Sequence, residues 1–402
     1  MSTRKRIGVF TEDFIHTKTS AGRHMTDLAL ELSKFEVQLE IFTLVESKQP
    51  QLNEYNLPEN IKVHCLPFAK NRNASLVIRT IKEFLISFRV LLYMIKKNKV
   101  DSFKNFLWYS PTIFWGPLAY FFKVWKKTKN ILIIRDIFPL WAVDLELIKP
   151  RSFIYYFFRI FELIQYKNAD VIAIQSEGNK EFFRYINGAH SKLTVLRTWY
   201  YPINTNLEIK DTFKKKIPFH SKRVCTYVGN LGIAQNQSFL IKMINELKKT
   251  KEHHFLFIGL KNSDRKLIED KANIYNMGNI TILPPMTQKD INPIISNSHL
   301  GLFSLDQRHS SHNIPGKFLH YISLGVPVFG LTNKNNDINS IINTNSLGGT
   351  YSGKNILEAS KYFRYLSDQI NEEKFKKETI QKYVEDNLCP AEAAMKILKH
   401  CV

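Results

Sequence analysis

Gly316 and Lys317 stand at the predicted start of a helix in the stretch NIPGKFLHYISLGVPVFG, residues 313–330. Apolar residues at helical spacing predict that helix over 315–324, and Pro315 suits its first turn. The first amides of a helix have no partner inside the helix and attract phosphate, glycine lets an anion approach the backbone, and lysine adds a full charge. The stretch therefore predicts an anion site, and an ordinary helix start with a surface lysine is the alternative.

A second glycine turn occurs in YVGNLGIAQN, residues 227–236. Gly229 and Gly232 allow a ligand to touch the backbone, while Asn230 and Gln235 offer amide side chains. The spacing matches neither the dinucleotide fingerprint nor the P-loop. We interpret the turn as part of the anion site, with a tight strand-to-helix connection as the alternative.

A third turn, TKTSAGRHMTD, covers residues 17–27. Ser20 and Gly22 precede a predicted helix, and Arg23 lies in its first turn. A cation at this end opposes the helix dipole, so Arg23 is expected to face an anion. A solvated arginine explains the same residue equally well.

Arg135 and Asp136 follow four apolar residues in IIRDIFPLWAVD, residues 133–144. Charges at the end of a buried strand are costly unless they are paired or lie in a solvated site. These two residues are therefore candidates for chemistry, and a structural ion pair is the alternative.

The elements that would position these residues alternate between strand and helix patterns. The alternation predicts an α/β protein of two Rossmann-like domains, whose parallel sheets face an interdomain cleft and bind ligands outside the carboxyl ends of the strands. We expect residues 1–200 to form an acceptor-binding domain and residues 201–385 a nucleotide-sugar-binding domain. Residues 386–402 are expected to form a helix that returns to the first domain.

Composition agrees with a globular protein: 402 residues are 44% hydrophobic and 23% charged. The four cysteines, Cys65, Cys225, Cys389 and Cys401, have no metal-ligand or disulfide spacing. We expect free thiols and no metal. The start, MSTRKRIGVF, is typical of a first strand and not of a signal peptide, which favours the cytoplasm.

Taken together, these blocks resemble glycosyltransferase family 4, whose members have the GT-B fold. The resemblance extends from RIGVF to about residue 390 and includes NNDINSIINTNSLG near the end. Within the family, the similarity is greatest to bacterial N-acetyl-L-fucosamine transferases that build O-antigens and capsules.

The resemblance implies retaining, metal-independent transfer from a nucleotide sugar, without a cofactor. Lys317 and the helix start beneath it would stabilise the leaving diphosphate, beside the loop at Gly229. Arg135 and Asp136 would stand where many relatives carry a strand-end histidine near the transferred sugar. The Gly22 turn would meet the sugar or its phosphate.

The sequence also departs from the family pattern. Many members carry two glutamates eight residues apart, and His312 and His320 occupy those positions here. His320 can bond a ribose hydroxyl, and we assign His312 and Asn313 to sugar binding. Structural roles for both histidines are the alternative. The usual Arg and Lys after the second glycine turn are absent, which places more weight on Lys317.

The net charge is +21. Residues 70–129 contribute +11, with 13 Lys or Arg against 2 Asp or Glu. Residues 75–97 combine apolar residues with a basic stripe (Arg79, Lys82, Arg89, Lys96), which is typical of a helix lying on an anionic membrane. The uncharged residues 106–122 are better interpreted as a domain helix than as a membrane span, since they contain two prolines and a glycine. No nucleic-acid motif is present, so nucleic acid is not an expected partner.

The sequence therefore predicts a glycosyltransferase of the hexosyltransferase type, peripheral on the inner face of the cell membrane. It would move an amino-sugar, for which N-acetyl-L-fucosamine is one candidate, from UDP to a polyprenyl-diphosphate-linked saccharide. A nucleotide-sugar epimerase of the same fold and a catalytically silent scaffold subunit are the alternatives.

Overall fold

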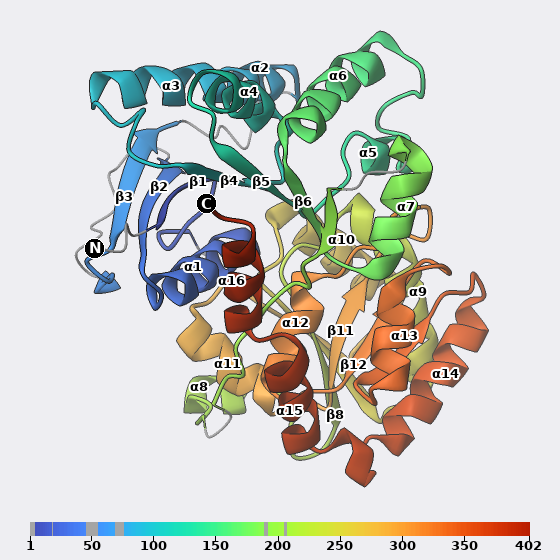
Figure 1. The fold of residues 1–402 in the computed structure, drawn as a ribbon. Helices are drawn as coiled ribbons and strands as arrows, with labels where there is room; N and C mark the ends of the chain where they lie inside the picture. Colours follow the sequence, from blue (N-terminus) through green and yellow to red (C-terminus); the bar gives the residue numbers. More distant parts are fainter. Residues whose placement is uncertain (1–4, 18, 46–54, 69–75, 189–191, 205–206) are drawn as a thin grey trace. The chain divides into compact units, whose positions relative to one another are not determined.

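The computed structural model describes the chain except for residues 1–4, 18, 46–54, 69–75, 189–191 and 205–206 (Figure 1). The chain divides into two compact units. Unit 1 comprises Met1–Trp199 and Cys389–Val402, and unit 2 comprises Tyr200–Leu388.

Unit 1 is built on a seven-stranded parallel sheet with the strand order β3-β2-β1-β4-β5-β6-β7. Helices cover both faces, so its central strands are apolar on both sides; β5 is buried along almost its whole length. The strands are β1 (Lys5–Thr11), β2 (Val37–Val45), β3 (Ile61–Pro67), β4 (Asn105–Ser110), β5 (Lys129–Ile134), β6 (Val171–Ile174) and β7 (Leu193–Val195).

Two helix layers enclose this sheet (Figure 1). One layer contains α1 (Ser20–Ser33) and α16 (Pro390–Lys399), which pack against each other and bury Leu28 and Ile397 on the sheet. The outer helix layer, on the opposite face, contains α2 (Leu76–Phe84), α3 (Ile86–Lys96), α4 (Gly116–Trp125), α6 (Phe153–Asn168) and α7 (Glu177–Asn187). The short α5 (Leu140–Asp144) follows β5.

The structure corrects two expectations for unit 1. The helix predicted over 75–97 is two helices, because α2 ends at Phe84 and α3 begins at Ile86. The strand edge predicted at Val100 and Asp101 lies in a turn, and the strand forms at β4, inside the uncharged stretch expected to be helical. β4 lies at the sheet centre with helices on both faces, so its apolar residues do not alternate with polar ones.

Unit 2 repeats the pattern on a six-stranded parallel sheet with the order β10-β9-β8-β11-β12-β13. The strands are β8 (Arg223–Val228), β9 (His253–Ile258), β10 (Ile280–Leu283), β11 (Leu300–Ser304), β12 (Val328–Leu331) and β13 (Gly348–Tyr351). The helices are α8 (Asp211–Lys214), α9 (Gln237–Leu247), α10 (Asn262–Ile274), α11 (Gln288–Ser296), α12 (Gly316–Ser323), α13 (Asp337–Thr344), α14 (Ile356–Gln369) and α15 (Lys377–Asn387).

Each face of the unit 2 sheet has its own apolar core. One core joins α11, α12, α13 and α15 to the sheet and includes Phe318 and Ile322. The other joins α9, α10 and α14 and includes Leu240 and Phe363. None of the helices in the described residues has the length and apolarity that a membrane crossing requires.

Candidate active site

The start of α12 is an uncapped helix N-terminus. Pro315 occupies the N-cap position with extended backbone (φ −68°, ψ 137°), and no side chain caps the helix. Pro315 therefore lies one residue before the helix and not inside its first turn. The first amides of α12, beginning at Gly316, are available to an anion.

Lys317 lies in the first turn of α12 and turns toward the end of β8. Its Nζ donates to the main-chain oxygen of Asn230 at 3.1 Å and lies 5.0 Å from the centroid of the Tyr227 ring. Burial lowers the pKa of Lys317 to about 8, against a smaller opposing effect of Asp264. A cation held by a carbonyl and a ring, with its charge only partly compensated, would be stabilised by an added anion.

The glycines of the loop after β8 are required mainly by the conformation and hydrogen bonds of the loop itself. Gly229 has φ +80°, a conformation that favours glycine. The Gly232 amide donates to Gln235 Oε1 at 2.8 Å, and the Leu231 amide donates to Asp264 Oδ2 at 3.2 Å. Gly232 and Gln235 therefore bond each other, and the loop offers an anion less than its sequence suggests.

Tyr321 locks α12 onto the sheet. Its hydroxyl accepts from the Val228 amide at 2.9 Å and donates to the Leu302 carbonyl at 3.1 Å. Its ring occupies the space beside Gly301, where a Cβ atom would lie 2.3 Å from Tyr321 Cγ. Because Tyr321 joins α12 to the end of β8 and to the middle of β11, the position of Lys317 on the same helix is fixed as well.

His312 is paired with a carboxylate. Its Nδ1 lies 2.9 Å from Asp337 Oδ1, at the start of α13. The neighbouring Asn313 accepts a hydrogen bond from Asn336 through its carbonyl oxygen, at 3.2 Å. These contacts hold the segment before α12 against the start of α13. They also place a carboxylate beside His312, where the family pattern has a glutamate and the sequence has a histidine.

His320 faces α11 and not the start of its own helix. Its Nε2 lies 2.8 Å from Asn292 Oδ1, and its ring lies 6.1 Å from the Tyr200 ring. These contacts provide a structural role for His320, and its predicted role in ribose binding stays a prediction.

In unit 1, Arg135 lies at the end of β5 among three side chains. Its guanidinium donates to His24 Nδ1 at 2.6 Å, to the Tyr109 hydroxyl at 3.0 Å and to Ser20 Oγ at 3.4 Å. Burial, then Arg135 and Arg23, lower the pKa of His24 well below its ordinary value. His24 is therefore neutral and accepts through Nδ1. Asp136 lies close enough to add its charge to the field on Arg135.

The sequence predicts Gly22 before the helix, but Gly22 lies in the first turn of α1 and serves packing. Thr19 caps α1 by accepting from the Gly22 amide at 3.0 Å. A Cβ atom on Gly22 would lie 2.1 Å from Thr17 Oγ1, so the missing side chain makes room for Thr17. Arg23 has an acidic partner in its own helix, with Nε 3.8 Å from Asp27 Oδ2.

The sequence did not single out four residues of these clusters: His24, Tyr109, Tyr227 and Asp337. Tyr109 and Tyr227 belong to apolar strands and resembled core residues. His24 lies on the buried side of α1, and a histidine beside Met25 and Leu28 was a usable signal. Among the described residues, no group of His, Cys, Asp and Glu is arranged to hold a metal ion.

No family model matches the sequence, and no curated protein matches it. The solved structures that are similar to it include three that cover nearly the whole chain. Sucrose-phosphate synthase from Thermosynechococcus elongatus shares 12% identity, with 98% of each chain covered and a TM-score of 0.73. WaaG, a glycosyltransferase involved in lipopolysaccharide biosynthesis, shares 12% identity over 97% of this chain and 99% of WaaG, with a TM-score of 0.69.

HepE of Anabaena, solved in complex with UDP and glucose, shares 11% identity over 98% of each chain, with a TM-score of 0.66. The chain has the GT-B fold. The predicted α/β class with two Rossmann-like parallel sheets is thereby confirmed. At these identities the GT-B likeness concerns the fold, and the residues described above must support the function.

Proposed function

We propose that the protein is a retaining, metal-independent glycosyltransferase that uses a UDP-sugar. The observation that supports this most directly is Lys317, a half-buried lysine in the first turn of an uncapped helix. A diphosphate at this place would meet both a full positive charge and the positive end of a helix dipole. UDP is favoured because HepE was solved with UDP, and a trehalose-phosphate enzyme of E. coli with a UDP-fluoroglucose.

In this proposal the residues of unit 2 act on the leaving group. As the bond between the sugar and the diphosphate breaks, negative charge grows on the phosphate oxygen, and Lys317 with the first amides of α12 stabilises it. The cation supplies charge stabilisation without a metal ion. His312, whose Nδ1 lies against both the carboxylate and the main-chain amide of Asp337, would bond a hydroxyl of the donor sugar through Nε2.

Unit 1 is proposed to bind the acceptor. Arg135 is the best candidate because its guanidinium is held by His24 and Tyr109, both buried, and also reaches Ser20 at the exposed start of α1. A phosphate or a sugar hydroxyl there would add to contacts that already fix the side chain. Asp136 beside it would orient a hydroxyl of the acceptor or of the transferred sugar.

The proposed acceptor is a polyprenyl-diphosphate-linked saccharide of O-antigen or capsule synthesis, and the proposed donor sugar is an amino-sugar such as N-acetyl-L-fucosamine. Family 4 membership belongs to the same proposal. A lipid-linked acceptor accounts for the basic and apolar segment 75–97, whose described part includes Lys82, Arg89 and Lys96. The protein would then work at the inner face of the cell membrane, bound to its surface.

Nucleotide binding tests the proposal first. UDP should raise the midpoint of thermal unfolding, while GDP and ADP at the same concentration should not, because a ligand specific to the folded state stabilises it. Equal shifts with all three nucleotides, or none, would contradict the UDP assignment. UDP-sugars incubated with lipid-linked saccharides then separate the alternatives: an epimerase changes the donor alone, and a scaffold changes neither substrate.

A further inference from the structure

Exposed apolar side chains concentrate on the outer helix layer of unit 1. Of the 22 large apolar side chains that are exposed in the described residues, thirteen lie on α2, α3, α4 and α6. Soluble surfaces carry such residues singly, and a gathering of this kind marks a surface that binds something apolar. The thirteen are Ile78, Ile81, Phe88, Leu92, Ile95, Tyr120, Val124, Trp125, Phe153, Ile154, Tyr156, Ile160 and Leu163.

Helix α6 is apolar on both sides. Its inner side buries Phe158 and Tyr166 in the unit, as expected for a helix that covers a sheet. Its outer side exposes Phe153, which is 85% accessible, together with Ile160 and Leu163. A helix that is apolar all round is normally enclosed on all sides, so its outer side lacks the apolar environment that its residues favour.

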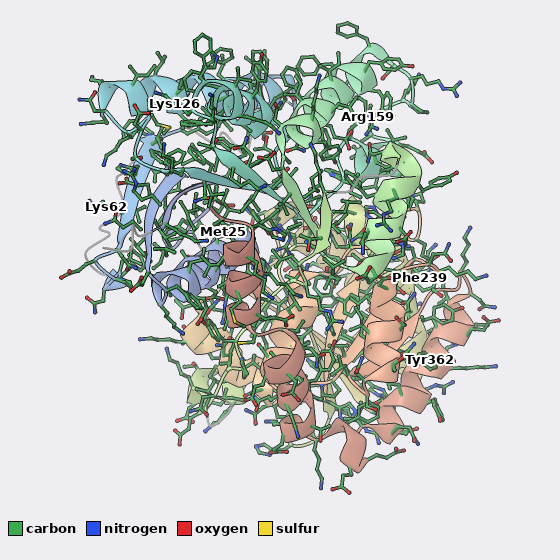
Figure 2. All side chains as sticks on the ribbon, in the orientation of Figure 1. Met25, Lys62, Lys126, Arg159, Phe239 and Tyr362 are labelled. Atoms are coloured by element: carbon green, nitrogen blue, oxygen red, sulfur yellow. The ribbon has the colours of Figure 1, made fainter. Side chains whose placement is uncertain are left out.

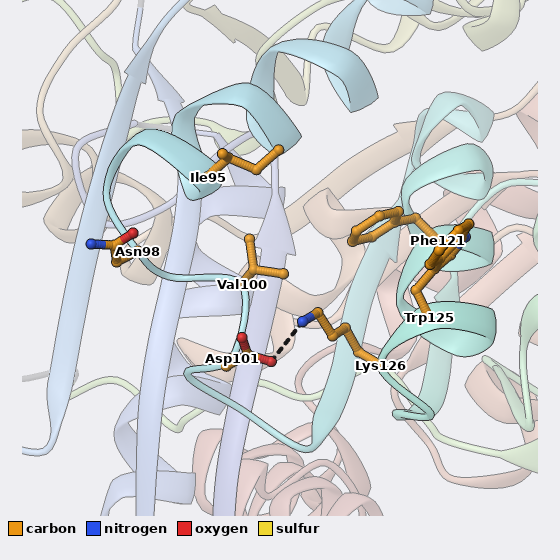
Figure 3. Close-up of a pocket in the computed structure, with 7 residues that line it drawn as sticks. All are labelled: Ile95, Asn98, Val100, Asp101, Phe121, Trp125 and Lys126. Carbon is orange, nitrogen blue, oxygen red and sulfur yellow. Dashed lines mark ion pairs between the residues drawn. The ribbon is translucent and has the colours of Figure 1, made fainter.

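Helices α3 and α4 continue the same surface. Trp125 is 72% exposed at the end of α4, and Ile95 is 54% exposed at the end of α3. Between them lies a hollow of about 410 Å³ that also includes Val100 and Phe121 (Figure 3). An ion pair between Lys126 and Asp101, 2.9 Å long, closes one side of it. The hollow is large enough for part of a hydrocarbon chain.

The net charge of the outer helix layer indicates which kind of partner would bind its exposed apolar surface. The sequences of α2, α3, α4, α6 and α7 contain nine Lys or Arg and four Asp or Glu. One of the acids, Glu162, is fully buried and paired with Arg159. Arg159 is labelled in Figure 2. Cations beside exposed aromatic and aliphatic groups match the anionic headgroups and hydrocarbon of a bilayer.

We propose that the outer helix layer rests on an anionic bilayer, with α6 and the end of α4 as the parts that enter the hydrocarbon. The biological purpose of this membrane contact rests on the proposed function, in which the acceptor is linked to a lipid. The proposal adds residues 153–163 and Trp125 to the membrane contact expected from residues 75–97. The cations of α2 and α3 attract the headgroups. The exposed apolar side chains of α6, together with Trp125, then insert into the hydrocarbon and keep the protein bound to the bilayer.

Vesicle sedimentation with the full chain tests the role of α6. Phe153→Ser, Ile154→Ser, Ile160→Ser and Leu163→Ser together should reduce partitioning onto vesicles of phosphatidylcholine and phosphatidylglycerol at least tenfold. All four residues are exposed, so circular dichroism should match the parent chain. The control, Ile274→Ser with Leu357→Ser and Tyr365→Ser, removes exposed apolar groups of unit 2 and should change partitioning less than twofold. Unchanged partitioning of the α6 variant would overturn the proposal.

Fluorescence tests which side enters the lipid. Trp125 is the most exposed tryptophan of the chain, so lipids brominated on the acyl chains should quench the parent protein more than a Trp125→Phe variant. Equal quenching of the two would overturn the proposal for α4.

The remaining experiment separates a bilayer from a second copy of the chain as the occupant. Light scattering without lipid should give the same mass for the parent and the α6 variant. A parent dimer that the variant converts to monomer would overturn the proposal. Stabilisation by UDP should persist in the variant, because Lys317 is untouched. A parent protein that binds vesicles but not UDP would contradict the proposed function, while the proposed membrane contact would still be supported.

Discussion

The Lys317 ammonium group and the Tyr227 hydroxyl donate to the same main-chain oxygen, that of Asn230, at 3.1 Å and 2.9 Å. The carbonyl thus holds a cation at the end of β8 in a fixed place. Among the described residues, the acidic group that acts on the Lys317 ammonium is Asp264, whose effect on the pKa is smaller than that of burial and which itself accepts from the Leu231 amide. The positive charge is therefore positioned without being neutralised, as an anion site requires.

Lys317→Met should weaken UDP binding by about 10–100-fold, since a hydrogen bond to a charged group contributes about 1.5–3 kcal/mol. The expected Kd change is measurable by calorimetry at pH 7. Lys361→Met removes an exposed lysine of α14 and serves as the control, with no change expected. Equal Kd values for the two variants would remove Lys317 from the site.

Binding of UDP should depend on pH above neutrality. The pKa of Lys317 is lowered to about 8 by burial, so the free protein loses this charge as pH rises through 8. An anion raises that pKa again, so binding takes up protons, and the affinity should fall up to about tenfold between pH 8 and 9. Calorimetry in buffers of different ionisation enthalpy measures the uptake, which Lys317→Met should abolish. A Kd that stays constant over this range would contradict the assignment.

Arg135→Met should lower the free energy of unfolding of unit 1 by about 1–3 kcal/mol, because it leaves His24 Nδ1 and the Tyr109 hydroxyl without their donor. The same variant should lose about 100-fold or more of transfer activity while UDP still binds, since Lys317 is untouched. Urea titration followed by fluorescence measures the first effect. The control is Arg184→Met, which removes a surface arginine paired with Glu181. Its free energy of unfolding should stay within about 0.5 kcal/mol of the parent value. A fully active Arg135→Met enzyme would show that the residue is structural only.

Gly301→Ala should destabilise unit 2 by about 1–3 kcal/mol and weaken UDP binding. The added methyl group would overlap the Tyr321 ring, whose hydroxyl joins α12 to the end of β8 and to the middle of β11. Gly278→Ala is a matched control, because a Cβ atom there has no neighbour within 4 Å. The midpoint of thermal unfolding, measured with and without UDP, distinguishes the two variants. Equal midpoints and equal shifts with UDP in both variants would mean that Tyr321 does not hold α12 in place.

The fold was predictable because its signals are local. An apolar run such as NILII, ending at Arg135, predicts a buried parallel strand wherever it occurs. The glycine turn at Gly229 and the helix start at Gly316 were found in the same way. The break at Leu85 was not predictable, because the apolar pattern continues across it and neighbouring helices decide where the chain bends.

Most of the contacts within the clusters depend on strand order and could not be predicted. Arg135 bonds His24, 111 positions away, because the end of β5 lies near the start of α1 in the fold. His312 meets Asp337 only because β12 follows β11 in the sheet. The membrane side of α6 was also missed, since FIYYFFRIF resembles a core helix until its accessibility is known.

The return of α16 to unit 1 has a consequence for synthesis. Ala394 and Ile397 fill the core beside α1, and Asn105 at the start of β4 bonds both the amide and the carbonyl oxygen of Val402. During translation, unit 2 emerges as one uninterrupted stretch and can close on itself, while the earlier-made sheet still exposes the groove that α16 will fill. The first unit made is thus the last to be completed, and a nascent chain stalled before residue 389 should be the form that chaperones capture.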